Sequence, residues 1–257
     1  MQERLNESLY RIANEPVLSY PFPHFFVEDV LPEDVYDRIH ANWPAPDSFL
    51  NYEEAKNPEK ERFYFPLEPE RIAKLPAAPR AFWDGIRAWL MSPDLRRIAL
   101  GKYQPNVDIL LSNVFGVPIG DDVIGSYTKY ALSLVWDISG YALLPHADDP
   151  RVIFNFLFYL PAPGEESAFG TSIYLPKDRT FLSSGEARHR RHEFEHVSTY
   201  PFKRNGMFSF MRTARSFHGV EPVTGENSVR RLILFSIRID EEMMPDRADE
   251  IAELVPA

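Results

Sequence analysis

The chain has 257 residues, no cysteine and a formal net charge of −10. The absence of cysteine excludes disulfides, thiolate nucleophiles and cysteine-ligated zinc, and the acidic balance argues against a nucleic-acid partner, which needs clustered Lys and Arg. Because 44% of the residues are hydrophobic while no secretory signal or membrane-spanning apolar run is visible, we expect a cytoplasmic protein with a sizeable core and no membrane partner.

Residues 1–106 show mainly helical patterns. Helices are predicted over residues 1–14, 31–43 and 77–100, the last broken at Ser92-Pro93-Asp94. A short strand is expected over Pro21–Val27, where the prolines favour a sheet edge. The polar, proline-punctuated stretch 44–70 is predicted to be a surface excursion or lid.

From residue 107 onward, short apolar runs alternate with turn residues. Strands are predicted over residues 128–137, 152–160, 172–174, 207–211, 217–220 and 231–239. The charged stretch 178–200 is interpreted as an insertion between strands, and residues 240–257 as a short terminal helix. Helices followed by strands predict one domain, residues 1–257, with helices packed on one side of a β-sandwich or barrel.

His146-Ala-Asp148, followed much later by His218, is the most informative pattern. Residues two apart on a strand share a face, and a histidine from a distant strand would complete two nitrogens and one carboxylate around a metal. That ligand set, with positions left open, is the facial triad of non-haem Fe(II) oxygenases. The alternative for the first segment is a turn in which Asp148 or Asp149 caps backbone amides.

Arg230 and Arg231 stand at the mouth of a strongly apolar strand. The alternation of side chains turns one of them inward, and a buried arginine needs an anionic partner. A bound dicarboxylate would serve, held by a bidentate guanidinium. An internal salt bridge to Asp or Glu is the alternative.

These motifs together resemble the Fe(II)- and 2-oxoglutarate-dependent dioxygenases, in particular their prolyl-4-hydroxylase-like branch. The resemblance covers about residues 127–240 and includes the segments 136–146, 151–161 and 170–176, with a similar N-terminal strand at 21–30. It implies a mainly β protein with packed helices, in which a double-stranded β-helix (jelly roll) over residues 107–240 holds Fe(II) at its open end.

The resemblance also implies roles for individual residues. His146, Asp148 and His218 would bind iron, and the far carboxylate of 2-oxoglutarate would meet Arg230, with Arg231 as the alternative. Asn155 and Tyr159 would share the strand face that contacts the co-substrate, and the alternative for Tyr159 is a simple core aromatic.

The implied reaction couples O2 and the conversion of 2-oxoglutarate to succinate and CO2 with hydroxylation of an unactivated C–H bond, with ascorbate as a candidate reductant. The retained Asp148 favours hydroxylation over halogenation. A small metabolite or natural-product intermediate is the favoured substrate, and a protein or peptide side chain is the alternative. Arg151, Arg215 and Trp136 are candidates for the substrate entrance, with surface salt bridges as the other interpretation for the arginines.

Two other classes remain open. His192-Glu193-Phe-Glu-His196 matches the zinc-protease pattern, which requires a helix. The segment is charged almost throughout and lacks an apolar face, so a solvated insertion is the favoured interpretation. A jelly roll that binds a metal without turnover is the second alternative, because a fold does not fix a function.

Overall fold

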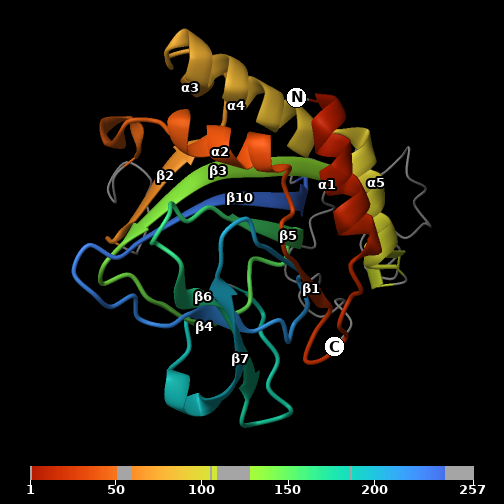
Figure 1. Ribbon diagram of the computed structural model, residues 1–257. Helices are drawn as coiled ribbons and strands as arrows, with labels where there is room; N and C mark the ends of the chain where they lie inside the picture. The colour runs from red at the N-terminus through yellow and green to blue at the C-terminus, as the bar shows by residue number, and fades with distance from the viewer. Residues whose placement is uncertain (1, 51–59, 105, 109–127, 186, 241–257) are drawn as a thin grey trace.

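Two antiparallel β-sheets face each other, and helices cover the outer face of the larger sheet (Figure 1). The computed structural model describes residues 2–50, 60–104, 106–108, 128–185 and 187–240. This arrangement confirms the predicted fold class, a mainly β protein with packed helices and a jelly-roll core. Residues 241–257, for which the sequence predicts a terminal helix, lie outside the described part.

The helices predicted within residues 1–106 are confirmed, and the short helix Pro69–Ile72 is one that the sequence analysis did not predict. The helices are α1 (Gln2–Asn14), α2 (Glu33–Ala41), α3 (Pro69–Ile72), α4 (Ala77–Leu90) and α5 (Pro93–Lys102), with short 3-10 turns at Pro46–Ser48 and Arg191–Glu193. The expected break between α4 and α5 is confirmed. Pro93 opens α5, and the Ser92 hydroxyl caps it by accepting a hydrogen bond from the Leu95 amide at 3.3 Å. No helix of the described residues has the length and apolar character to cross a bilayer.

The larger sheet has the strand order β1-β8-β5-β10-β3-β2, and the smaller one β4-β9-β6-β7. The larger sheet contains β1 (His24–Val27), β2 (Arg62–Pro66), β3 (Thr128–Ile138), β5 (Val152–Tyr159), β8 (Met207–Met211) and β10 (Val229–Ile239). The smaller sheet contains β4 (Leu143–His146), β6 (Ser167–Pro176), β7 (Phe194–Phe202) and β9 (His218–Val220). β1 lies at a sheet edge, as its prolines predict.

Two segments interpreted from the sequence as irregular contain strands. β2 lies inside the stretch 44–70 and pairs with β3, so the prediction of a mere surface excursion is wrong for its last third. β7 begins inside the stretch 178–200, ends at Phe202 and pairs with β6. Both are edge strands. β7 is mostly exposed, so its sequence lacks the apolar run that indicates a buried strand. β2 is mostly of intermediate burial and carries the short aromatic run Phe63-Tyr64-Phe65 inside an otherwise polar stretch. β6 is also longer than its predicted core, 172–174.

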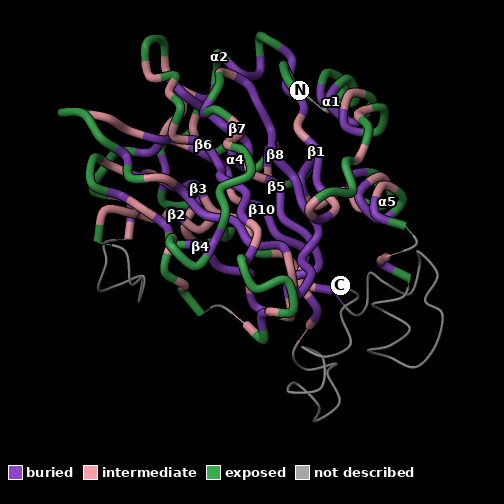
Figure 2. Tube along the Cα trace, turned by 90° about the horizontal axis from the view of Figure 1, so that it is seen from below, coloured by how far each residue is buried: buried purple, intermediate pink, exposed green. Residues whose placement is uncertain are grey.

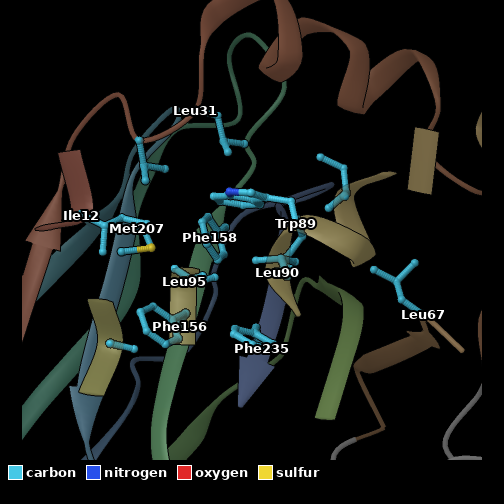
Figure 3. Packing of buried hydrophobic residues seen from close by; sticks show 14 of the residues in the cluster. Ile12, Leu31, Leu67, Trp89, Leu90, Leu95, Phe156, Phe158, Met207 and Phe235 are labelled. Atoms are coloured by element: carbon cyan, nitrogen blue, oxygen red, sulfur yellow. The ribbon is translucent and has the colours of Figure 1, made fainter. Parts of the chain in front are cut away.

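The main hydrophobic core fills the space between the helices and the larger sheet (Figure 3). α4 contributes one apolar face, from which Trp89 packs edge-on against Phe158 of β5 at 6.0 Å between ring centroids. Figure 2 shows that β5, β8 and β10 are buried along most of their length. A smaller aromatic cluster lies between the two sheets and includes Tyr159 and Phe210.

We expect Phe158→Ala to lower the free energy of unfolding by about 3–5 kcal/mol, because the removed ring leaves a cavity against Trp89. Chemical denaturation followed by tryptophan fluorescence measures this change. Tyr10→Ala is the control, since Tyr10 is 72% exposed and should change stability by less than about 0.5 kcal/mol. A loss below about 1 kcal/mol for Phe158→Ala would contradict the assignment of this core.

Candidate metal centre

Pairing of β4 with β9 brings the two histidines together, because His146 and His218 are direct cross-strand partners. Their ring centroids lie 4.3 Å apart. The carboxylate of Asp148 reaches both rings, at 3.4 Å from His146 Nε2 and 3.7 Å from His218 Nε2. One ligand atom from each of the three residues lies within 4.8 Å of the others. The predicted constellation therefore converges on one point.

The reason why Asp148 joins the cluster differs from the expected one. β4 ends at His146, so Asp148 lies in the following loop and strand alternation does not place it. Two hydrogen bonds position it instead. Asn155 Nδ2 donates to Asp148 Oδ2 at 2.6 Å, and Arg212 Nε donates to the Asp148 backbone oxygen at 3.1 Å. The capping role considered for this turn belongs to Asp149, which accepts from the Arg151 amide at 2.8 Å.

Both imidazoles are held so that Nε2 faces the shared carboxylate. Nδ1 of His146 lies 3.0 Å from the Leu144 carbonyl oxygen, and Nδ1 of His218 lies 2.9 Å from the Ser216 carbonyl oxygen. A carbonyl can only accept, so each Nδ1 carries a proton, and in the neutral imidazole the lone pair is then on Nε2. Such outer hydrogen bonds are the usual means of fixing the tautomer of a metal-binding histidine.

The electrostatics of the cluster favour the forms that bind metals. Burial lowers the pKa of His218 to about 4, which keeps its imidazole neutral at pH 7. Burial acts to raise the pKa of Asp148, but the neighbouring His218 and His146 outweigh it and leave this pKa below its usual range. A neutral imidazole and an ionised carboxylate are the states a divalent cation requires.

We expect Asn155→Ala to weaken divalent-metal binding by about 10- to 100-fold, the usual effect of removing an outer-shell partner. Asn155 donates to Asp148 and accepts a hydrogen bond from the Ser236 hydroxyl, so the carboxylate loses its orientation without it. Titration calorimetry with Mn(II) measures the change. Asn14→Ala on α1 is the matched control, and an unchanged affinity in Asn155→Ala would contradict the assigned role.

A cavity of about 280 Å³ opens between the sheets, with the metal-binding cluster and Arg230 both in its wall. Its other wall residues are Arg62, Tyr64, Leu143, Val152, Asn155, Leu157, Thr171, Arg188, Phe210, Gly219, Val220, Leu232, Leu234, Ser236 and Arg238. The cavity therefore joins a metal centre to a cationic end through an apolar middle.

Of the two neighbouring arginines, Arg230 faces this cavity and Arg231 does not, which agrees with what the resemblance implies. Arg230 is only 2% exposed and pairs with the fully buried Asp137. Arg231 is on the other face of β10 and pairs with Glu165, so both arginines form the salt bridge that the sequence analysis gave as the alternative. Arg62 also binds Asp137, with Nε 2.6 Å from Oδ1 and Nη2 2.9 Å from Oδ2. Two guanidinium groups thus share one carboxylate.

Two polar atoms near this ion pair are buried without a hydrogen-bond partner among the described residues. They are Nε of Arg230 and the hydroxyl of Tyr141. The Arg62 guanidinium lies 4.2 Å from the centroid of the Tyr141 ring. A buried polar atom without a hydrogen-bond partner costs free energy and is uncommon. This end of the cavity therefore has two hydrogen-bond donors that lack an acceptor among the described residues.

Asn155 and Tyr159 share the inner face of β5, as parity predicts, but only Asn155 lies in the cavity wall. The Tyr159 hydroxyl donates to Thr171 Oγ1 at 2.6 Å, and Thr171 is the residue in the wall. Arg62 and Thr171 are cavity residues that the sequence analysis missed. The three consecutive aromatic residues Phe63, Tyr64 and Phe65 were the only sequence signal for the strand that carries Arg62.

Other predicted site residues lie elsewhere. Trp136 packs against Phe49 on the helical side of the sheet and not at an entrance. Arg215 is not in the cavity wall either. Arg151 forms an ion pair with Asp149, so the salt-bridge interpretation holds for it.

The zinc-protease pattern fails in the structure. His192 and Glu193 lie in a 3-10 turn and His196 lies on β7, so the helix that the pattern needs does not form. His196 Nε2 makes a 2.7 Å hydrogen bond with Thr199. In the part of the chain that the structure describes, His146, Asp148 and His218 form the only group of three or more such residues arranged to hold a metal.

No protein-family model and no curated protein sequence matches the chain. Solved structures do match. A prolyl hydroxylase from Trichoplax adhaerens, solved with a peptide of the hypoxia-inducible factor oxygen degradation domain, superposes with a TM-score of 0.52 at 12% identity over 94% of this chain and 91% of its own. The expected resemblance to the Fe(II)/2-oxoglutarate oxygenases is thereby confirmed at the level of the fold.

Two further matches are weaker. A Pseudomonas putida prolyl-4-hydroxylase has a TM-score of 0.47 at 13% identity, over 92% of this chain and 99% of its own. The epimerase SnoN, in complex with Fe3+, α-ketoglutarate and nogalamycin RO, has a TM-score of 0.47 at 11% identity, over 93% and 85%.

Proposed function

We propose that the protein is an Fe(II)- and 2-oxoglutarate-dependent dioxygenase that hydroxylates an unactivated C–H bond. One observation carries the proposal: a buried cluster of two histidines and one aspartate opens into a cavity whose other end holds a guanidinium pair sharing one carboxylate. The cluster of two histidines and one aspartate fits a ferrous ion with open coordination positions. The guanidinium pair fits the far carboxylate of a diacid.

The metal fit rests on the donor set. His146 and His218 offer their Nε2 atoms and Asp148 offers a carboxylate oxygen, all within 4.8 Å. A bound iron(II) would supply the redox chemistry that couples decarboxylation of 2-oxoglutarate to oxidation of the substrate. The chain's own contribution is to hold the three ligands in place, with Asn155 orienting the carboxylate. The presence of Asp148 favours hydroxylation over halogenation, because no ligand position is left for a halide.

The diacid fit rests on the buried guanidinium group and on nearby hydrogen-bond donors. Arg230 lies in the cavity wall and shares the carboxylate of Asp137 with Arg62. The far carboxylate of 2-oxoglutarate would pair with Arg230 and accept hydrogen bonds from Arg230 Nε and the Tyr141 hydroxyl, which have no partner among the described residues. Arg230 is the residue proposed to bind the co-substrate. Asn155 contributes indirectly, because it donates a hydrogen bond to Asp148. Tyr159 also contributes indirectly, because it donates a hydrogen bond to Thr171 in the cavity wall.

The middle of the cavity has an apolar wall. Leu157, Leu232 and Leu234 line it between the metal centre and the cationic end, and Phe210 packs against His218 with 4.4 Å between ring centroids. Exclusion of water by such a wall would strengthen the electrostatic interactions inside the site and protect reactive species from side reactions. The residues of β2 and β1 complete the same sheet, which supports one domain over residues 1–257.

We propose a small metabolite or natural-product intermediate as the substrate. A cavity of about 280 Å³ that must also hold 2-oxoglutarate leaves room for a compact group. A peptide side chain is the second candidate, because the Trichoplax adhaerens protein of the same fold was solved with a peptide.

The test is formation of succinate from 2-oxoglutarate under air with Fe(II), with ascorbate as the reductant and with a panel of small molecules as substrates. The proposal expects succinate that depends on iron and on O2. A metal-binding jelly roll without catalysis would bind Mn(II) and 2-oxoglutarate in calorimetry yet release no succinate with any member of the panel. A chain that binds neither would contradict the proposal altogether.

A further inference from the structure

β10 carries a second arginine into the cavity, on the other side of the metal centre from Arg230. The inward residues Arg230, Leu232, Leu234, Ser236 and Arg238 all lie in the cavity wall. The Ser236 hydroxyl donates to Asn155, which donates to Asp148, so Ser236 marks the level of the metal centre. Arg238 follows two residues later on the same face, about 7 Å farther along the strand.

The charge of Arg238 is only partly compensated. Its Nη2 lies 3.2 Å from Asp149 Oδ2. The same carboxylate is held more closely by Arg151, whose Nε lies 2.8 and 2.9 Å from the two oxygens. Arg238 is therefore the weaker partner in a shared ion pair, and its side chain is 24% exposed. It has both the charge and the access to meet a ligand.

A second cation stands behind this pair. Arg212 is fully buried, and its Nε donates to the Asp148 backbone oxygen at 3.1 Å. Its Nη1 and Nη2 have no hydrogen-bond partner among the described residues. Because a guanidinium stays protonated in proteins, Arg212 adds a positive charge at a place where the carboxylate of Asp148 is committed to the metal.

The charges of the loaded site can be compared group by group. An iron(II) ion would be balanced by Asp148 and by the carboxylate of 2-oxoglutarate that chelates it. The far carboxylate would pair with Arg230, which shares Asp137 with Arg62. Two further guanidinium groups lie near the metal centre: Arg212 donates to the Asp148 backbone oxygen, and Arg238 shares the carboxylate of Asp149 with Arg151. This positive charge is local, since the whole chain has a net charge of −10.

We propose that the primary substrate carries an anionic group, a carboxylate or a phosphate, that pairs with Arg238. This inference rests on the proposed function and assigns the substrate class of that site. The guanidinium of Arg238 would form the direct contact, while Arg212 would add attraction from behind. The anion would then lie on the opposite side of the metal from 2-oxoglutarate, and the C–H bond to be oxidised would lie a short distance from the charged group.

The test uses the full chain loaded with Mn(II) and 2-oxoglutarate without O2, and two probes, inorganic phosphate and acetate. Paramagnetic broadening of the phosphorus signal or of the acetate methyl signal reports binding near the metal. We expect saturable broadening in the wild type, about tenfold weaker binding in Arg238→Gln, and most of the affinity retained in Arg238→Lys. Whichever probe binds more tightly identifies the anion.

Arg179→Gln is the matched control. It removes the same charge from an exposed arginine that pairs with Glu195 on β7, and it should leave probe binding unchanged. Equal binding of both probes to wild type and Arg238→Gln, or no binding to either, would overturn the inference. Calorimetry on the same samples distinguishes failure of this inference from failure of the proposed function. If Mn(II) and 2-oxoglutarate bind but neither probe does, only the inference about Arg238 is contradicted. If Mn(II) and 2-oxoglutarate do not bind, the proposed function is contradicted as well.

Discussion

Asp148→Ala is expected to abolish iron-dependent turnover of 2-oxoglutarate and to weaken divalent-metal binding by more than about 100-fold, beyond the effect of losing an outer-shell partner. The carboxylate is the anionic member of the cluster and lies 3.4 and 3.7 Å from the two imidazole Nε2 atoms. Without it, two neutral imidazoles hold the cation with no charge to balance it. Calorimetry with Mn(II) and succinate release with Fe(II) measure the two effects.

His196→Ala is the control for this experiment. His196 belongs to the zinc-protease pattern but lies on β7 and makes a hydrogen bond with Thr199. It should retain metal binding and turnover. The opposite result, with metal binding lost in His196→Ala and kept in Asp148→Ala, would place the metal centre at the His192–His196 segment and contradict the oxygenase assignment.

Arg230→Met is expected to raise the KM for 2-oxoglutarate by about 100-fold or more, the range associated with removing one partner of a buried ion pair. The guanidinium is a buried cation that faces the cavity and pairs with Asp137. Its removal takes away the positive charge that the far carboxylate of 2-oxoglutarate would meet. The metal ligands are untouched, so Mn(II) affinity in the absence of 2-oxoglutarate should stay the same.

Arg231→Met provides the comparison, since the neighbouring residue carries the same charge on the opposite face of β10 and pairs with Glu165. It should leave the KM for 2-oxoglutarate within about twofold of the wild type, because part-exposed ion pairs contribute little. A larger effect from Arg231 than from Arg230 would show that the register of β10 is misassigned.

The metal ligands could be predicted because their signals are local. His146 and Asp148 are two residues apart, and His218 stands in an apolar, strand-like run, so residue type and spacing alone indicated the cluster. The fold class followed from the order of helices and strands. Even here, the reason for the position of Asp148 was wrong, since hydrogen bonds from Asn155 and Arg212 position it and not strand alternation.

The cationic end could not be predicted in the same way because it depends on non-local pairing. Asp137 is the direct cross-strand partner of Arg62 on one side and of Arg230 on the other. Cross-strand partners point to the same face of a sheet, so the register of three strands creates the cluster. The stretch that carries Arg62 was interpreted as polar surface. No sequence pattern links Arg62 to Asp137, which follows 75 positions later, or to Arg230, which follows 168 positions later.

A crystal structure of the protein with Mn(II) and 2-oxoglutarate, grown without O2, tests the central claim most directly. The account predicts one metal ion bound by His146 Nε2, His218 Nε2 and an oxygen of Asp148, with the far carboxylate of 2-oxoglutarate in contact with Arg230. A metal bound elsewhere, or a co-substrate whose far carboxylate turns away from the Arg62–Asp137–Arg230 group, would contradict it.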